Sequence, residues 1–186
     1  MNIVSDVPIP LIFDFEMTFN EVLVKVVLPL ILTFFIAGLI GLERQNVGKA
    51  AGISAHLLVA MGSAGIAIMQ RLMYEYQIEM VAQGFSIDPQ GQRVIAQVVT
   101  GIGFVGAGVI LKDSEYGIKG ITTAATIWST AMIGLILGSG FFLIGGMLGL
   151  FLVLFIAVRD LKRGFSPFRP HHVTDEIAER IEEKHE

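Results

Sequence analysis

The charge-free stretch from Gly120 to Val158 constrains the fold of this chain more than any other feature. As one helix it would be about 58 Å long at about 1.5 Å per residue, nearly twice the roughly 30 Å hydrocarbon core of a membrane. It therefore predicts two consecutive membrane-spanning helices, with a turn at Gly138, Ser139 and Gly140. Of the 186 residues, 53% are hydrophobic and 16% charged, whereas soluble domains carry about 25% charged residues. The chain is thus predicted to be a membrane protein.

Apolar runs elsewhere predict three more spans. The five expected spans are Val22–Leu42, Ala51–Met69, Val94–Leu111, Ile121–Leu137 and Phe141–Val158. Between the second and third, Arg71–Ala82 is expected to form a separate short polar helix that Gly84 ends, before a turn at residues 88–91. The predicted fold class is an all-α membrane protein, a bundle of five transmembrane helices.

Lysine and arginine are distributed unequally between the two sides of these spans, and cytoplasmic loops carry the excess. With the N-terminus outside, eight lie on the inner side before the end of the chain and three on the outer side, which predicts an N-out, C-in orientation. The inner eight are Arg44, Lys49, Lys112, Lys119, Arg159, Lys162, Arg163 and Arg169, and the outer three are Lys25, Arg71 and Arg93. The expected organisation is an extracytoplasmic or interfacial segment over residues 1–21, a transmembrane domain over 22–161 and a cytoplasmic tail over 162–186.

Several functional classes are not expected from the composition. The sequence has no cysteine and no motif of a zinc protease, a serine hydrolase or a phosphate-binding loop, so neither enzymatic activity nor a cofactor is expected. A net charge of −4 gives no basic footprint for nucleic acid. Glu43 is the only carboxylate expected near the bundle core, since Asp113 and Glu115 lie on a short inner loop. A dehydrated Mg²⁺ cage is therefore not expected, and any metal ligands stay unknown.

Polar side chains within the spans are the candidate functional residues, because such groups are costly in a membrane. Glu43 and Arg44 form an adjacent pair of opposite charges near His56. Four hydroxyls share one face of the fourth span, those of Thr122, Thr126, Ser129 and Thr130. Because the third and fourth spans run in opposite directions, a polar seam is expected between Arg93 outside and Glu43 inside. Its predicted members are Glu43, Arg44, His56, Arg93, Gln97, Thr100, Thr123 and Thr126.

Two simpler interpretations of these polar residues stay open. Glu43 and Arg44 are also explained by a boundary ion pair that anchors two helices. The hydroxyl face is also explained by packing, with threonines bonded to the carbonyls of their own helix.

Glycines gather in the third span, at Gly101, Gly103, Gly106 and Gly108. Three of them fit G-x-G-x-x-G, but no strand precedes them and no acidic residue follows near the twentieth position, so a dinucleotide site is not expected. They are expected instead to let helices pack closely, which makes the third span the predicted central helix. Gly103→Leu is accordingly expected to disrupt assembly far more than Gly140→Leu at the turn.

Small residues four apart occur on three spans and predict close helix contacts. The pairs are Gly103 with Ala107, Ala37 with Gly41, and Gly145 with Gly149. Such contacts form within one chain or between copies, so a homo-oligomer is expected, with a dimer favoured.

Two blocks of sequence resemble the membrane domain of the MgtC/SapB family. The first contains Gly41-Leu42-Glu43-Arg44, Ala51-Gly52, His56-Leu57-Leu58-Val59 and Gly62-Ser63-Ala64. The second contains Asp88-Pro89, Arg93, Ala96-Gln97-Val98-Val99, Gly101-Ile102-Gly103-Phe104 and Gly106-Ala107-Gly108-Val109-Ile110, followed by Gly120 and Thr123-Ala124-Ala125-Thr126-Ile127-Trp128. The resemblance covers about Pro29 to Leu161 and adds Trp128 to the predicted seam.

This resemblance implies a bacterial inner-membrane protein tied to growth at low magnesium and to survival in host phagocytes. It further implies a non-enzymatic regulator that restrains another membrane protein, such as the F-type ATP synthase. The chain is expected to be a short form without the cytoplasmic domain of longer members. Two alternatives remain: a transporter or channel for Mg²⁺ or another cation that uses the seam, and a structural dimeric membrane module.

Overall fold

The computed structural model describes residues 17–91, 93–113 and 117–162. Its N-terminal rod consists of α1 (Phe19–Val22), a π-helical turn η1 (Leu23–Val27) and α2 (Leu28–Asn46). The other helices are α3 (Ile53–Ala82), α4 (Arg93–Ala107), α5 (Ile121–Gly138) and α6 (Phe142–Lys162). The tail predicted after Lys162, most of the N-terminal segment and Glu115 lie outside the described residues.

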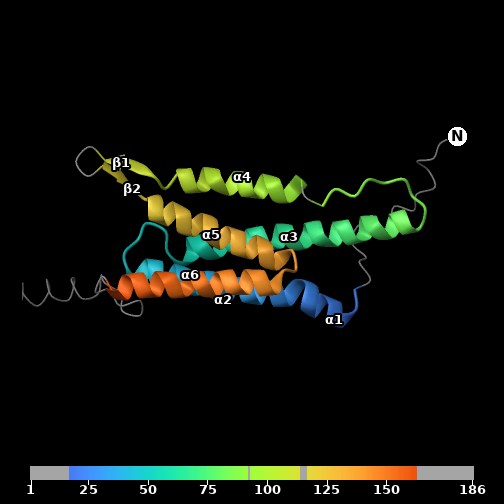
Figure 1. The fold of residues 1–186 in the computed structure, drawn as a ribbon, viewed down its shortest axis with the longest axis horizontal. Helices are drawn as coiled ribbons and strands as arrows, with labels where there is room; N and C mark the ends of the chain where they lie inside the picture. Colours follow the sequence, from blue (N-terminus) through green and yellow to red (C-terminus); the bar gives the residue numbers. More distant parts are fainter. Residues whose placement is uncertain (1–16, 92, 114–116, 163–186) are drawn as a thin grey trace, which may run out of the picture.

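The predicted all-α membrane bundle of five helices is confirmed, since the rod and the four later helices lie alongside one another (Figure 1). Four of the five are long and apolar enough to cross a membrane, namely the rod Phe19–Asn46, α3, α5 and α6. The 15 residues of α4 form a shorter apolar helix, about 22 Å long at 1.5 Å per residue. The orientation of the bundle stays a prediction.

Two local features differ from the sequence expectation. Arg71–Ala82 is not a separate helix but the last part of α3, whose 30 residues span about 45 Å. Polar residues from Arg71 onward leave the helix intact because they lie beyond the length that the core requires, and Gly84 follows its end with a φ of +95°. The loop between α4 and α5 forms a small antiparallel hairpin, in which β1 (Leu111–Asp113) pairs with β2 (Gly117–Lys119).

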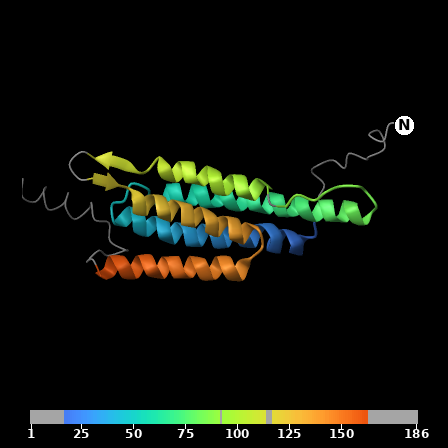
Figure 2. The ribbon, with the colours of Figure 1, turned by 45° about the horizontal axis from the view of Figure 1, so that its top comes forward.

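The central helix of the bundle is α5, which contacts the rod and the three other helices α3, α4 and α6. Helices α4 and α6 lie at opposite sides of the bundle, with α3, α5 and α2 between them (Figure 2). Buried Ile133 and Leu137 of α5 meet Ile40 of α2 and Ile156 of α6 in the apolar core. The prediction that the third span is central is therefore wrong, because α4 contacts only one side of the bundle.

The tightest helix contact joins α5 to α3 through small residues. A Cβ on Gly134 would overlap the carbonyl oxygen of Ala60, and one on Gly138 would overlap that of Ala64. Two of the predicted small-residue pairs also mark close contacts. A Cβ on Gly41 would lie 2.6 Å from the Cα of Ile53, and the space beside Gly145 and Gly149 is filled by Leu137 and Ile36.

The glycines of α4 are placed differently. A Cβ on Gly101 or Gly103 would meet no described atom within 4 Å, and one on Gly106 would make ordinary contact, 3.6 Å from the carbonyl oxygen of Ala124. Gly140, in contrast, has a φ of +92°, and a Cβ there would lie 2.6 Å from Nη1 of Arg71. The structure thus reverses the expected sensitivities of Gly103 and Gly140 within one chain.

Candidate functional site

Four charged side chains form a cluster at one end of the bundle, on α2 and α6. Arg44 binds Glu43 with two hydrogen bonds, 2.5 Å from Nε to Oε2 and 2.6 Å from Nη2 to Oε1. Nη2 of Arg44 also donates to Oδ2 of Asp160. Arg159 donates to Asp160 in turn, at 2.7 Å from Nε to Oδ1 and 3.1 Å from Nη2 to Oδ2. The cluster therefore links α2 to α6 through residues 116 positions apart.

Three of the four members of this charge cluster (Glu43, Arg44, Asp160 and Arg159) are deeply buried, and Arg159 is partly exposed. The exposed fractions are 0% for Arg44, 1% for Asp160 and 6% for Glu43. Two carboxylates and two guanidinium groups balance in formal charge, which offsets the desolvation that burial of each ion would otherwise cost. Removing one member leaves an uncompensated buried charge, so the cluster acts as a unit.

The sequence prediction found half of this cluster. Asp160 lies just beyond the last predicted span, so it was not placed in the core, and the expectation that Glu43 is the only carboxylate near the core is wrong. The sequence offered one signal, an acidic residue directly beside Arg159 at the end of a span. Only the packing of α6 against α2 shows that this acid contacts Arg44.

His56 connects α3 to α5 beside the cluster. Its ring is fully buried, with Nδ1 2.8 Å from the carbonyl oxygen of Gly52 and Nε2 3.3 Å from the hydroxyl oxygen of Thr126. A carbonyl oxygen accepts only, so Nδ1 carries a proton and donates it to Gly52. Nε2 of the neutral ring is then an acceptor, and it shares the single hydroxyl proton of Thr126 with the carbonyl oxygen of Thr123.

The buried hydroxyls of α5 bond their own helix. Thr126 donates to the carbonyl oxygen of Thr123 at 2.9 Å, and Thr130 donates to that of Thr126 at 2.6 Å. Thr123, Thr126 and Thr130 are buried, whereas Thr122 is exposed and Ser129 is partly exposed. The inward face thus differs by about one residue from the predicted one. These bonds are the ones expected if the hydroxyl face serves helix packing, with threonines bonded to carbonyls of their own helix.

The predicted seam does not continue into α4. Arg93, Gln97 and Thr100 are exposed on the outer side of that helix, and Thr100 donates to the carbonyl oxygen of Ala96 at 3.1 Å. Trp128 is 42% exposed. The prediction placed the α4 residues at plausible depths, but depth does not determine which way a side chain points around the helix axis. The structure brings together Glu43, Arg44, His56, Thr123 and Thr126 and leaves the other members apart.

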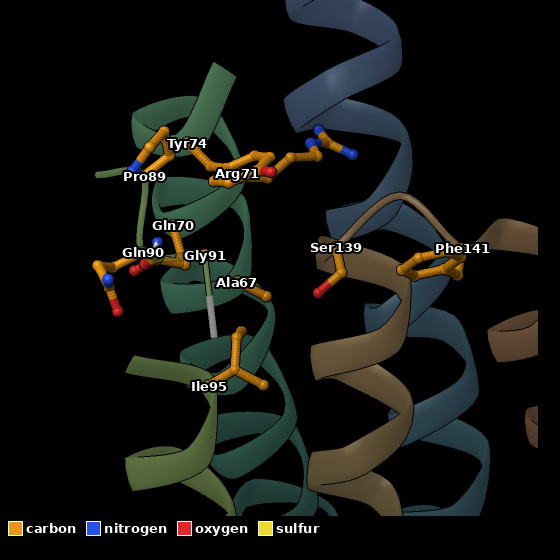
Figure 3. A pocket seen from close by; sticks show the side chains of 10 residues that line it. All are labelled: Ala67, Gln70, Arg71, Tyr74, Pro89, Gln90, Gly91, Ile95, Ser139 and Phe141. Carbon is orange, nitrogen blue, oxygen red and sulfur yellow. Dashed lines mark hydrogen bonds between the residues drawn. The ribbon is translucent and has the colours of Figure 1, made fainter. Parts of the chain in front are cut away.

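A second polar region lies at the opposite end of the bundle, where a cavity of about 580 Å³ opens between α3, the loop before α4 and the α5–α6 turn (Figure 3). Gln70 donates to the carbonyl oxygen of Gln90 across this cavity at 3.1 Å. Arg71 lines it and donates from Nη2 to the carbonyl oxygen of Lys25, and Lys25 binds Glu75 at 2.8 Å. No sequence motif marks these residues as a site, because they meet only through the way the loop before α4 folds back onto α3.

Metal binding finds no ready ligand set in the part of the chain that the structure describes. No three histidine or acidic side chains come together there in a way that would hold a metal ion. Both carboxylates of the charge cluster already accept hydrogen bonds from arginine.

Comparison with known proteins identifies the family. The family model described as the MgtC family matches residues 30–163, which contain the charge cluster and all the residues that line the cavity of about 580 Å³. The chain belongs to the MgtC family. No solved structure matches it.

Among curated MgtC-family relatives, the "Putative magnesium transporter YhiD" of Escherichia coli K12 is 44% identical over 119 residues, which cover 64% of this chain and 53% of that protein. "Protein MgtC" of Brucella abortus is 39% identical over 107 residues, 58% of this chain and 40% of that protein. A Synechocystis protein without an assigned function is 35% identical over 162 residues, 86% of this chain and 61% of that protein. The chain spans about half the length of the curated relatives that it matches.

Proposed function

We propose that this chain is a non-enzymatic inner-membrane protein of magnesium homeostasis that regulates another membrane protein and does not itself conduct ions. The observation that carries the proposal is the interior of α5. Its inward hydroxyls end at Thr130, and the buried residues from Ala131 to Leu137 are apolar. A conducting path needs polar or hydrated lining through the membrane. This apolar stretch of α5, between the charge cluster and the cavity of about 580 Å³, therefore supports regulation over transport.

The charge cluster supports the same proposal. Each carboxylate accepts from arginine, so a cation entering there would compete with two guanidinium groups. Hydrated Mg²⁺ sites use free carboxylates and retained waters, which this balanced arrangement does not offer. The cluster is better suited to fix α6 against α2 and so to shape the surface that a partner would contact.

The link to magnesium rests on the relatives, one of which carries magnesium in its printed name. The family resemblance implies adaptation to low magnesium, survival in host cells and restraint of the F-type ATP synthase. We extend these roles to this chain as a proposal, with the F-type ATP synthase as the first partner to test and a homodimer as the first assembly.

The test uses the full chain in proteoliposomes that enclose a Mg²⁺-sensitive dye. We expect Mg²⁺ entry equal to that of empty liposomes. Entry above that level, lost in Glu43→Gln but retained in the exposed α4 variant Gln97→Leu, would establish the alternative of a cation transporter and overturn the proposal.

The regulatory arm uses inverted bacterial membranes that contain the F-type ATP synthase. Added wild-type chain is expected to lower ATP-driven proton pumping, and Glu43→Gln, at equal abundance, to do so less. Unchanged pumping with wild-type chain would remove the ATP synthase as partner.

A growth assay tests the same variant in cells that lack their own homologue. The wild-type chain should restore growth at limiting Mg²⁺, whereas Glu43→Gln should not. Equal growth of both would leave the cluster without a functional role.

A further inference from the structure

A second cavity, of about 310 Å³, lies beside the charge cluster at the end of the bundle that carries the β1–β2 hairpin. Four of its nine described lining residues are cationic, and none of the nine is acidic. The cations are Arg44 and Lys49 from the α2–α3 region, Lys119 from β2 and Arg159 from α6. Side chains far apart in the sequence thus bring positive charge to one cavity.

Arg44 shows that this arrangement is incomplete in the chain alone. Its side chain is 0% exposed, and its Nε and Nη2 are bonded to Glu43 and Asp160. Nη1, however, has no hydrogen-bond partner among the described residues. A buried donor without an acceptor costs about 1–3 kcal/mol, and more when it is charged. An anion in the cavity that Arg44 lines would supply the missing acceptor.

The N-terminus of α5 points to the same ligand class. Gly120, Thr122 and Thr123 line the cavity, and no side chain caps the helix there. The first amides of an α-helix have no acceptor within the helix, and they carry the positive end of its dipole. Gly120 has a φ of +91°, and a Cβ there would overlap the carbonyl oxygen of Val109, so the turn that presents these amides depends on glycine.

We propose that this cavity binds a phosphate group. Guanidinium and ammonium groups, threonine hydroxyls and the amides of a helix N-terminus are the donors that tetrahedral phosphate oxygens accept from. Two of the four cations, Arg44 and Arg159, are balanced by Glu43 and Asp160, which lie outside the lining. These two arginines therefore contribute hydrogen-bond donors rather than net positive charge, and Lys49 contributes an exposed ammonium group. The phosphate belongs either to a soluble anion or to an anionic phospholipid headgroup, since the cavity lies at one end of a membrane bundle.

The first experiment measures soluble phosphate. Purified full-length chain in detergent is titrated with inorganic phosphate by calorimetry at fixed ionic strength, with chloride as the competing anion. Lys49 is an exposed lining residue outside the charge cluster, so Lys49→Gln is expected to remove cavity charge and to leave the fold intact. We expect about tenfold weaker binding in Lys49→Gln, the factor equivalent to 1.4 kcal/mol. Lys162→Gln, exposed on α6 and outside the lining, is the matched control and should bind as wild type.

The second experiment measures lipid. The same three proteins are placed in nanodiscs of phosphatidylcholine with and without phosphatidylglycerol, and retained lipid is counted by native mass spectrometry. The site is assigned to a lipid headgroup if two conditions hold. Less phosphatidylglycerol is retained in Lys49→Gln but not in Lys162→Gln, and inorganic phosphate does not bind. Binding of inorganic phosphate with that same pattern assigns it to a soluble anion.

Two results would overturn the proposal. One is the absence of both kinds of binding in wild-type protein. The other is an equal loss in Lys49→Gln and Lys162→Gln, which would mean a diffuse attraction to the basic end of the bundle. Thr122→Val provides an uncharged check, because it removes a lining hydroxyl from an exposed position, and weaker binding in this variant supports specific recognition.

Discussion

Helices α4 and α5 are neighbours with similar side chains, glycines and threonines among branched apolar residues, yet they occupy opposite environments. The glycines of α5 meet the backbone of α3 at Ala60 and Ala64, whereas Gly101 and Gly103 of α4 meet no described atom within 4 Å. A small residue allows close approach only where the facing helix also presents one. A glycine pattern therefore predicts close helix packing only when the facing helix also has small residues at the contact.

The largest expected effect is at the α5–α3 contact. Gly138→Leu would drive a side chain into the carbonyl oxygen of Ala64, where backbone must move, so we expect loss of folded protein, a cost above the roughly 1–3 kcal/mol of ordinary overpacking. Gly103→Leu should leave the monomer's melting temperature unchanged. Both are compared by size-exclusion yield and melting in detergent. Equal damage from both variants would break the distinction between the helices.

The next effect separates the buried charge cluster from the exposed charge on α4. Asp160→Asn leaves Arg159 without a carboxylate and Arg44 with Glu43 alone, and breaking a buried pair costs about 3–5 kcal/mol. Arg93→Gln, on the exposed side of α4, should change stability by less than about 0.5 kcal/mol. Reversible unfolding in mixed detergent measures both. An Asp160→Asn protein as stable as wild type would show that the cluster does not hold α6 in place.

A smaller effect concerns hydroxyls on the two helices. Thr130→Val removes a buried 2.6 Å bond to the carbonyl oxygen of Thr126, and we expect a loss of about 1 kcal/mol. Thr100→Val removes the corresponding bond on the exposed helix and should cost less, because its surroundings are not packed. The same unfolding assay ranks the two. A larger loss for Thr100→Val would indicate that α4 is covered by another molecule.

The smallest effect on stability, and the most informative about assembly, is expected from α4. Phe104 is 84% exposed beside Gly103, and the chain has no native cysteine. If the predicted homodimer forms through α4, Phe104→Cys should crosslink in membranes, and Gly103→Leu in the same chain should reduce the crosslinked fraction severalfold. Phe155→Cys, 54% exposed on α6, is the control. Crosslinking through Phe155→Cys alone would place the contact on the other side of the bundle.

Much of the fold was predictable because membrane thickness fixes helix length. The charge-free stretch from Gly120 to Val158 gave two spans, and the structure has α5 and α6 there with a turn at Ser139 and Gly140. Hydropathy does not predict the rotation of each helix about its axis, and so it does not tell which side chains face the bundle. That is why α4 was predicted as the central helix, and why Arg93 was placed in a seam that it does not enter.

The candidate site was predictable where it is local. Glu43 and Arg44 are adjacent in the sequence, and their position at the end of a span already indicates a paired group. Asp160 could not be assigned to them, because its contact with Arg44 depends on the packing of α6 against α2. The phosphate cavity was even less predictable from the sequence, because its cations come from three separate segments.

The distance in sequence between Arg44 and Asp160 has a consequence for biosynthesis. The chain is made from its N-terminus, so α2 enters the membrane long before α6 has been translated. Until then, Arg44 has Glu43 alone as a counter-ion. Arrival of the final helix brings Asp160 and Arg159 together, so the formal charge stays balanced while Arg44 gains its second carboxylate. Insertion of α6 is therefore the step that links the first span to the last.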